Sequence, residues 1–470
     1  MSLPELPPSL AASPLPKYLE IYRRFRAAID QGQLRAGERV PSVRALAEEL
    51  KVARGTVETA YQLLTSEGFF QARGQAGTVI AEWSAQRSIS APLPEVPAAA
   101  QRGVSLPLQL GLPALDAFPR KLWARLVTWQ VRQADPQSLA LTDVCGYAPL
   151  REAIADYLAL YRGVPCAPAQ VFISAGYCAS LGLVCDALDM AGQRCWFEDP
   201  GYLHARDFLA HEGVELIPVP VDQDGLQVEE GVRRQPQARL AVVTPSHQSP
   251  LGVPLSPGRR RELLAWTQAQ GSWVIEDDYD SEFRYKGQPL AALKSLDLDD
   301  RVIYAGSFSK MLFPGLRLGY LVVPQALVER FERSAGQLHN RNAELLQATA
   351  AAFLAQGHFT RHLKKMRQLY TVRRGLLVDA LRVHCADLLR VDPQAGGINL
   401  LARLLVEVSD QRIAQRALAA GLAIQAISAW SLEADQERGL LMGFTNVASQ
   451  EQAMAIAQQL REVIQQTMAS

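Results

Sequence analysis

Residues 302–320, VIYAGSFSKMLFPGLRLGY, join an apolar run to a lysine and to groups that can hold a phosphate. The run 302–305 predicts a short buried strand. The polar groups that follow it are Ser307, Ser309, Lys310 and Arg317. A lysine amine can form a Schiff base with an aldehyde, while hydroxyls and a guanidinium bind phosphate oxygens. The stretch therefore fits an aldehyde cofactor that bears a phosphate, although an isolated lysine after a strand is more often a solvated surface charge.

Working outward, short apolar runs alternate with helical patterns over the central part of the chain. The runs are 171–173, 195–197, 240–243, 273–275 and 302–305. Helical segments between them include 178–190 and 256–270. Buried runs that alternate with helices predict an α/β fold with a mainly parallel sheet. Because ligands of such sheets bind beyond the carboxyl ends of the strands, the residues after each run are the candidate site.

The run 273–275 is followed by an acidic cluster. Three aspartates and two glutamates lie between residues 276 and 282. The glycine and ligand spacing of an EF-hand are absent, and a solvated turn is the plain alternative. In extended chain, residues two apart share a face, which puts Asp277 and Tyr279 on the same side. An aspartate can keep a pyridine nitrogen protonated, and a phenol can bond a ring hydroxyl, as a pyridoxal ring requires.

Two other strand ends carry suitable groups. Residues 174–179 form a turn of small residues that opens a helix, and a helix N-terminus binds phosphate. Tyr202 follows the run 195–197 and offers an aromatic face to a planar ring. By itself the turn is a weak signal, because many helices begin this way.

The N-terminal region predicts three helices and a hairpin. A helix over 16–31 is followed by one that begins after the N-cap residue Ser42, and a third opens at Arg54. Two short strands, 69–72 and 78–80, flank a glycine-rich turn. This is the pattern of a winged helix-turn-helix. The pattern alone leaves open a small helical bundle without a DNA-binding role.

Residues 16–82 resemble the winged helix-turn-helix of the GntR family of bacterial repressors. The similarity is carried by PSVRALA at 41–47, VARGTVETAYQLL at 52–64, and EGFF with RGQAGT within 67–78. It implies double-stranded operator DNA as a partner. The candidate DNA-binding residues are Arg44, Arg54, Gly55, Thr56 and Arg73, with the arginines placed for phosphates or guanine edges. The family usually has a polar residue at the position of Gly55, so base readout there is expected to be weaker.

Charge and composition set limits on the rest. The chain has 470 residues and a formal net charge of zero, and residues 1–82 hold 10 Lys and Arg against 9 Asp and Glu, a difference of +1. Such a weak field favours a dimer as the DNA-binding species. Six cysteines without a CxxC pair indicate reduced thiols in a cytoplasmic protein and no metal site. Neither a signal peptide nor a membrane span is expected.

We expect a DNA-binding domain at 14–82, a proline-containing linker at 83–107 and a larger effector domain at 108–466. Within the last, a long helical run is predicted from 325 to 356 and another from 359 to 386. Residues 387–470 mix strands and helices and predict a smaller α+β domain.

Residues from about 108 to 466 resemble fold-type I pyridoxal-phosphate (PLP) enzymes of the aspartate aminotransferase group. With a GntR-type head, the architecture is similar to the MocR/GabR subfamily of transcriptional regulators. The carrying motifs are SFSK with Arg317 downstream, EDDYDSEF, EDPGY, TPSHQ with PLG, and GYAPLREAIA. The resemblance implies that Lys310 forms the Schiff base, Asp277 pairs with the pyridine nitrogen, Tyr279 bonds the ring hydroxyl and Tyr202 stacks on the ring. It assigns the phosphate to Gly176, Tyr177, Cys178, Ser307, Ser309 and Arg317.

Several positions depart from the aminotransferase pattern. Ser249 replaces an asparagine that tunes the ring hydroxyl, and Leu141 replaces a tyrosine that reaches a phosphate across the dimer. Leu441 stands where an arginine clamps an amino-acid carboxylate, with Arg438 nearby but out of phase. An alternative ligand-binding arginine, two residues after the stacking tyrosine, is replaced by His204, followed by Arg206.

These features predict a homodimeric PLP-dependent regulator that senses PLP itself or a small amine or amino acid, with little turnover. A catalytically active aminotransferase with a GntR-type head is the alternative. A DNA-binding protein with a cofactor-free effector domain is a third.

Overall fold

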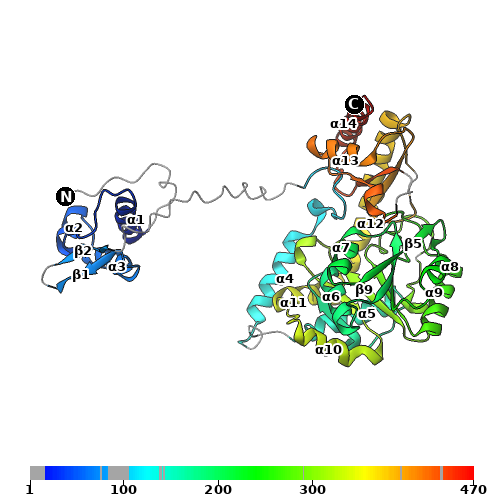
Figure 1. Ribbon diagram of the computed structural model, residues 1–470, viewed down its shortest axis with the longest axis horizontal. Helices are drawn as coiled ribbons and strands as arrows, with labels where there is room; N and C mark the ends of the chain where they lie inside the picture. The colour runs from blue at the N-terminus through cyan, green and yellow to red at the C-terminus, as the bar shows by residue number, and fades with distance from the viewer. Residues whose placement is uncertain are drawn as a thin grey trace. The chain divides into compact units, whose positions relative to one another are not determined.

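A computed structural model describes residues 16–74, 77–82, 105–136, 140, 143–288, 290–391, 394–433 and 438–469. The chain separates into two compact units, Met1–Arg102 and Gly103–Ser470, which we describe separately (Figure 1). Of the predicted linker, residues 83–104 lie outside the described residues.

The first unit is a three-helix head with a hairpin. Its elements are α1 (Lys17–Asp30), α2 (Val43–Leu50), α3 (Arg54–Ser66), β1 (Phe70–Ala72) and β2 (Thr78–Ile80). As predicted, Ser42 caps α2, since its Oγ accepts a hydrogen bond from the Ala45 amide at 3.2 Å. Phe25, Tyr61 and Phe70 meet edge to face with centroids 5.0–5.6 Å apart, and this aromatic core fixes the hairpin against α1 and α3.

The second unit is built on an eight-stranded sheet in the order β3-β10-β9-β8-β7-β4-β5-β6. The strands are β3 (Val171–Ser174), β4 (Arg194–Asp199), β5 (Glu215–Asp222), β6 (Gly225–Leu226), β7 (Leu240–Val243), β8 (Trp273–Asp278), β9 (Val302–Ser307) and β10 (Gly319–Val322). The run β9-β8-β7-β4-β5 is parallel, while β10 is antiparallel to both of its neighbours. The mainly parallel sheet is therefore confirmed.

Helices cover this sheet, as Figure 1 shows. They are α4 (Arg120–Gln133), α5 (Ala148–Tyr161), α6 (Tyr177–Ala187), α7 (Leu203–His211), α8 (Val228–Arg234), α9 (Pro257–Gln270), α10 (Val328–Gln337) and α11 (Glu344–Ala355). Alternate strand residues enter different cores: Tyr304 packs in one hydrophobic cluster, while Ile303 and Ala305 pack in another. Both faces of β9 are therefore buried, which explains its unbroken apolar run.

A smaller α+β part completes the unit. It contains α12 (His358–Cys385), α13 (Asp410–Ala419), α14 (Gln450–Met468) and an antiparallel sheet ordered β11-β12-β14-β13. Its strands are β11 (Leu389–Val391), β12 (Asn399–Leu404), β13 (Gln425–Ala426) and β14 (Gly439–Gly443). The predicted smaller domain thus has the expected composition.

Two sequence expectations differ from the structure. The predicted helical run 325–356 is interrupted between α10 and α11, where His339 takes a positive φ of 49°. Asn340 causes this break, because its Nδ2 donates to the carbonyls of Val144 and Ile173 at 2.9 and 2.7 Å and draws the chain to the sheet. Strand β10 was not predicted, since it follows the lysine stretch without a helix between. No described helix is long and apolar enough to cross a membrane.

Candidate functional site

The lysine stretch lies beyond the carboxyl end of β9 and returns to the sheet through β10. Gly306 lies against the Tyr320 ring, where a Cβ would come within 2.2 Å of Cζ. After Lys310, a 3₁₀ turn (Pro314–Leu316) leads to Arg317, which takes a left-handed φ of 52°. The turn places the lysine and the arginine at the same edge of the sheet.

The Lys310 amine is buried beneath the backbone of Gly111. Burial lowers the pKa of Lys310, and the carboxylates of Asp277 and Asp280 partly oppose this shift. A Cβ at Gly111 would lie 2.6 Å from Lys310 Nζ, and its φ is +72°. The positive φ and this close approach favour glycine, so the backbone of Gly111 lies directly against the amine. A lowered pKa favours the neutral amine, the form that attacks a carbonyl carbon.

Asp277 lies at the end of β8 and faces the site. Burial raises the pKa of Asp277 well above its ordinary value, while neighbouring Tyr177 and Lys310 lower it. The residues on either side point away: Glu276 accepts from the Leu293 and Lys294 amides, both at 2.7 Å, and Asp278 pairs with Arg162. The expected alternation in this cluster is therefore present. The described residues contain no group of His, Cys, Asp and Glu that could hold a metal ion.

Two aromatic residues flank this carboxylate. The hydroxyl of Tyr279 lies 3.0 Å from Nδ1 of His247. Tyr202 begins α7, and its ring lies 6.1 Å from Tyr177 and 6.0 Å from Trp430. Asp277 raises the pKa of both Tyr202 and Tyr279, although burial is the larger cause, so all three side chains approach one space.

The phosphate end is formed by α6 and the lysine stretch. Gly176, with φ +101°, precedes α6, and a Cβ there would lie 3.5 Å from Cζ of Arg317. Arg317 also lowers the pKa of Cys178, although burial raises it more. The Ser309 amide donates to Ser307 Oγ at 3.2 Å, which turns this hydroxyl pair toward one strand end. A guanidinium beside a helix N-terminus is a built anion site.

These side chains fit PLP. The buried carboxyl of Asp277 forms no ion pair among the described residues, although Lys310 lies near enough to lower its pKa, and it suits a protonated ring nitrogen. The buried hydroxyl of Tyr177 lies beside this carboxylate and lowers the pKa of Asp277 through a side-chain hydrogen bond. Lys310 would hold the aldehyde carbon and Arg317 the phosphate. When bound, PLP supplies an electrophilic carbon and an electron-withdrawing ring.

An apolar cluster surrounds Leu441, the residue that the sequence resemblance aligns with a carboxylate-clamping arginine. It consists of Leu401, Ile427, Trp430 and Leu441, and the first and last are paired directly across β12 and β14. Leu441 is 2 % exposed, and Tyr202 and Leu110 pack against the cluster. An amino-acid carboxylate would therefore meet hydrocarbon here rather than a guanidinium.

The alternative arginines are engaged elsewhere. Arg206 donates to the carbonyls of Ala429 and Ser431 at 3.3 and 3.5 Å and pairs with Asp207. Arg438 is exposed. Ser249 lies beside Tyr279 and lowers its pKa through a side-chain hydrogen bond, although burial dominates and raises it. Leu141 lies outside the described residues.

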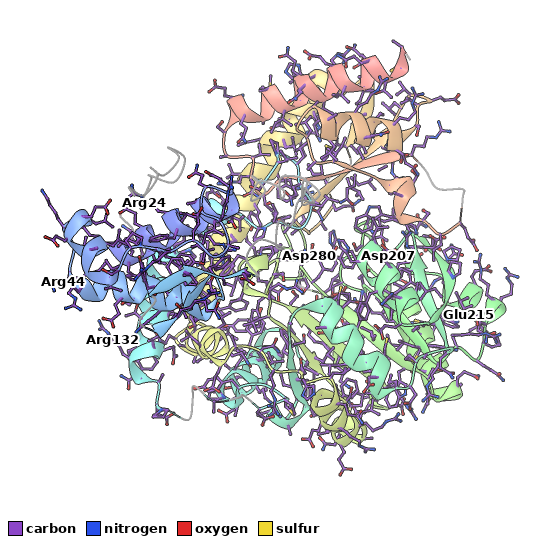
Figure 2. The ribbon with its side chains drawn as sticks, turned by 60° about the vertical axis from the view of Figure 1, so that its left-hand side comes forward. Arg24, Arg44, Arg132, Asp207, Glu215 and Asp280 are labelled. Carbon is purple, nitrogen blue, oxygen red and sulfur yellow. The ribbon has the colours of Figure 1, made fainter. Side chains whose placement is uncertain are left out.

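On the head, the predicted DNA-binding residues are open to solvent. Arg44, Arg54 and Arg73 are exposed and form no ion pair among the described residues; Arg44 is labelled in Figure 2. Gly55 has no heavy atom near its Cβ position, and Thr56 is half-buried in the first turn of α3. They occupy α2, the start of α3 and the turn after β1.

Several site residues have no recognisable signal in the sequence. His247 lies in the TPSHQ motif, but the carboxylate that faces it, Asp280, is recognised only once β8 and β7 are side by side. Leu110, Gly111 and Trp430 come from segments far from the lysine in sequence, and no local pattern marks them.

Comparison with known proteins supports both halves. The family described as bacterial regulatory proteins, gntR family, matches residues 17–80, and aminotransferase class I and II matches residues 116–439. The chain is 36% identical to the probable rhizopine catabolism regulatory protein MocR of Rhizobium meliloti, covering 92% of this chain and 91% of that protein. It is 32% identical to the pyridoxine biosynthesis transcriptional regulator PdxR of Corynebacterium glutamicum, covering 90% and 91%.

A solved aminotransferase structure is similar in fold to the larger unit. The multiple substrate aminotransferase of Thermococcus profundus superposes with a TM-score of 0.70 at 26% identity, covering 79% of this chain and 93% of that one. The enzyme matches the larger unit, and the MocR and PdxR proteins match over nearly the whole chain. The chain therefore belongs to the MocR group of GntR-type transcriptional regulators, in which a winged helix-turn-helix head is joined to a PLP-binding domain of the aminotransferase class I and II fold.

Proposed function

We propose that this regulator senses PLP, or a small amine or amino acid that binds beside it, and changes its binding to operator DNA in response. The single observation that carries this is the combination of a complete set of PLP-binding side chains with an apolar cluster at the carboxylate position. A site that keeps its cofactor but lacks a substrate clamp suits sensing better than turnover.

In this proposal each side chain has a separate task. Lys310, whose pKa burial lowers, bonds the aldehyde carbon, and Asp277 pairs with the ring nitrogen. Tyr279 donates to the ring oxygen and Tyr202 covers one face of the ring. The phosphate is held by the residues at the start of α6 and in the lysine stretch: Gly176, Tyr177, Cys178, Ser307, Ser309 and Arg317.

PLP itself is the favoured signal. Leu441 and Leu401 remove the positive charge that would select an amino acid, so a ligand with a carboxylate loses a charge-assisted hydrogen bond at this position. The relative PdxR is named as a regulator of pyridoxine biosynthesis, which supports a cofactor-sensing role here. A primary amine without a carboxylate is the next candidate, because it needs no clamp.

DNA binding is assigned to the head. Arg54 and Thr56 at the start of α3 would enter or border the major groove, with Arg44 on α2 and Arg73 on the hairpin turn contacting the phosphates. The weak net charge of the head supports a homodimer as the binding species, since two heads double the number of phosphate contacts.

The active-aminotransferase alternative is tested by a half-reaction. The PLP-loaded protein is mixed with common amino acids, and conversion of the cofactor to its amine form is followed by absorbance. We expect conversion to be far slower than the ~10 s⁻¹ of a typical enzyme. Conversion at enzyme rates would replace the sensor proposal with catalysis.

A further inference from the structure

His247 connects the phenol of Tyr279 to a buried carboxylate. Its Nδ1 lies 3.0 Å from Tyr279 Oη and 3.2 Å from Asp280 Oδ1. The side chains of His247 and Asp280 are 12% and 1% exposed. Asp280 belongs to the segment that follows β8 and is labelled in Figure 2. One imidazole nitrogen therefore faces two oxygens at hydrogen-bonding distance.

The carboxylate determines which nitrogen carries the proton. An ionised Asp280 can only accept hydrogen bonds, so a lone pair at His247 Nδ1 would face it with repulsion. The favoured tautomer has its proton on Nδ1, shared between Asp280 Oδ1 and Tyr279 Oη. Because Tyr279 Oη then accepts from the imidazole, its own proton is free to point the other way, into the site.

Glycines fix the imidazole in this orientation. A Cβ at Gly397 would lie 2.1 Å from His247 Cε1, and one at Gly252 would lie 3.0 Å from Nε2. Both glycines have positive φ, of 85° and 74°. The ring is therefore held closely between two backbone segments, and its position depends on their lack of side chains.

We propose that His247 and Asp280 are positioning residues that hold Tyr279 as a hydrogen-bond donor to the ring oxygen of bound PLP. They would supply by a different route the control of this oxygen that an asparagine gives at the position of Ser249. The inference rests on the proposed cofactor roles of Lys310 and Tyr279.

The surrounding charges are consistent with a phenol that stays protonated. Burial raises the pKa of Tyr279 well above its ordinary value, and the carboxylates of Asp280, Asp277 and Glu198 raise it further, while the side-chain hydrogen bond with Ser249 opposes them by lowering it. The far side of the pair faces a cavity of about 70 Å³ lined also by Ser246, Ser281 and Arg284. His247 Nε2 and Asp280 Oδ2 have no partner among the described residues, and both residues line this cavity, whose volume is large enough to admit water.

The test follows the absorbance of the PLP-loaded full-length protein as a function of pH. If the donor is lost, the ring oxygen keeps more negative charge and holds the neighbouring proton on the lysine-linked nitrogen more tightly. His247→Leu should therefore move the midpoint of the absorbance change upward, on the order of 1 pH unit. It should weaken PLP binding by roughly 2- to 10-fold, as expected for one hydrogen bond.

Matched variants separate positioning from damage to the fold. His247→Asn keeps a short N–H donor near the position of Nδ1 and should restore most of the midpoint, whereas Asp280→Asn should shift it in the same direction as His247→Leu. In a Tyr279→Phe background, His247→Leu should cause no further shift, since the phenol through which it acts is gone. Thermal unfolding of each variant shows whether it has folded.

Three results would overturn the proposal: an unchanged midpoint in His247→Leu, a full shift in His247→Asn, or additive shifts in the double variant. Failure of the proposed cofactor role is distinguishable, because the unaltered protein would then show no lysine-dependent absorbance band at all.

Discussion

Arg162 and Asp278 form a buried ion pair behind the candidate site, with Nη2 and Oδ2 2.6 Å apart. Their side chains are 5% and 1% exposed, and Tyr304 Oη donates to the same carboxylate oxygen at 2.5 Å. Asp278 follows Asp277 on β8. The ion pair therefore fixes the strand that carries the candidate cofactor-binding carboxylate, Asp277. The acidic cluster thus contains residues that hold the fold, such as Asp278, and residues that face the site, Asp277 and Asp280.

Removing one partner of this pair should destabilise the protein strongly. Asp278→Asn leaves the buried Arg162 guanidinium without its hydrogen-bonded ion-pair partner, which costs about 3–5 kcal/mol of the free energy of unfolding. Urea denaturation measures the change. Arg194→Ala is the control: it breaks an ion pair with Glu215 whose side chains are 51% and 55% exposed, and should cost less than about 1 kcal/mol. Equal losses in the two variants would contradict this role of Asp278.

Glu198 should make stability depend on pH. Burial raises its pKa to about 7, although it accepts hydrogen bonds from Thr244 and Gln248. At pH values between about 4.5, the ordinary pKa, and about 7, the pKa in the folded state, Glu198 binds more protons in the folded state than in the unfolded state. Its contribution to stability is therefore full at low pH and falls as the pH rises through about 7.

Glu198→Gln removes this titration and isolates the effect. The stability of the unaltered protein relative to the variant should fall by roughly 1–3 kcal/mol between about pH 5 and about pH 7.5. Neighbouring Glu276 and Glu282, whose pKa values burial also raises to about 7, titrate in both proteins and cancel in the difference. A difference that is flat or rises with pH would show that Glu198 is ionised in the fold.

Gly111 should be required for the lysine to bond PLP. Gly111→Ala places a Cβ 2.6 Å from Lys310 Nζ, so the amine must shift, and PLP binding followed by its visible absorbance should weaken by about 3- to 10-fold. Gly192→Ala is a matched control, since Gly192 has the same φ of +72° and nothing within 4 Å of its Cβ position. Both variants carry the backbone strain of a positive φ, and only the first should lose the cofactor. Similar PLP binding in the two would indicate that the segment over Lys310 is easily displaced.

Arg54 should contribute to DNA affinity beyond its charge. Arg54→Ala at the start of α3 is expected to weaken operator binding by about 1–3 kcal/mol if it contacts a guanine, or to reduce the salt dependence by about one phosphate contact. Arg35→Ala removes the same charge from an exposed turn of the head and should change affinity far less. Anisotropy titrations at several salt concentrations separate these outcomes. Equal losses of DNA affinity in Arg54→Ala and Arg35→Ala would mean that the head binds DNA through its overall positive charge, and not through specific contacts of α3.

The sequence predicts the fold class well because its signals are local. Ser42 as a cap, the start of α3 at Arg54 and the apolar run that becomes β9 each depend on residues within one turn or strand. The break between α10 and α11 could not be predicted, because it depends on Asn340 bonding carbonyls almost two hundred residues earlier. Strand β10 was missed for a related reason: its partners, β3 and β9, give no signal in its own sequence.

The site residues, too, fall into those that the sequence predicts and those that it does not. Lys310, Asp277 and Tyr202 are found from sequence because each follows a recognisable strand. Gly111 and Trp430 are not, since their importance comes from backbone approach and from packing between distant segments. His247 is an intermediate case. Its motif is recognisable in the sequence, but its proposed role depends on the contact with Asp280, which only the structure shows.

The central claim is that PLP on Lys310 controls DNA binding, and one experiment tests it directly. Binding to the DNA that flanks the protein's own gene is measured by footprinting and anisotropy, with and without PLP, for the unaltered protein and Lys310→Ala. We predict that PLP changes the affinity of the unaltered protein by about 5-fold or more, the scale of an allosteric coupling, and leaves Lys310→Ala unchanged. No effect of PLP on the unaltered protein, or the same effect on Lys310→Ala, would contradict the claim.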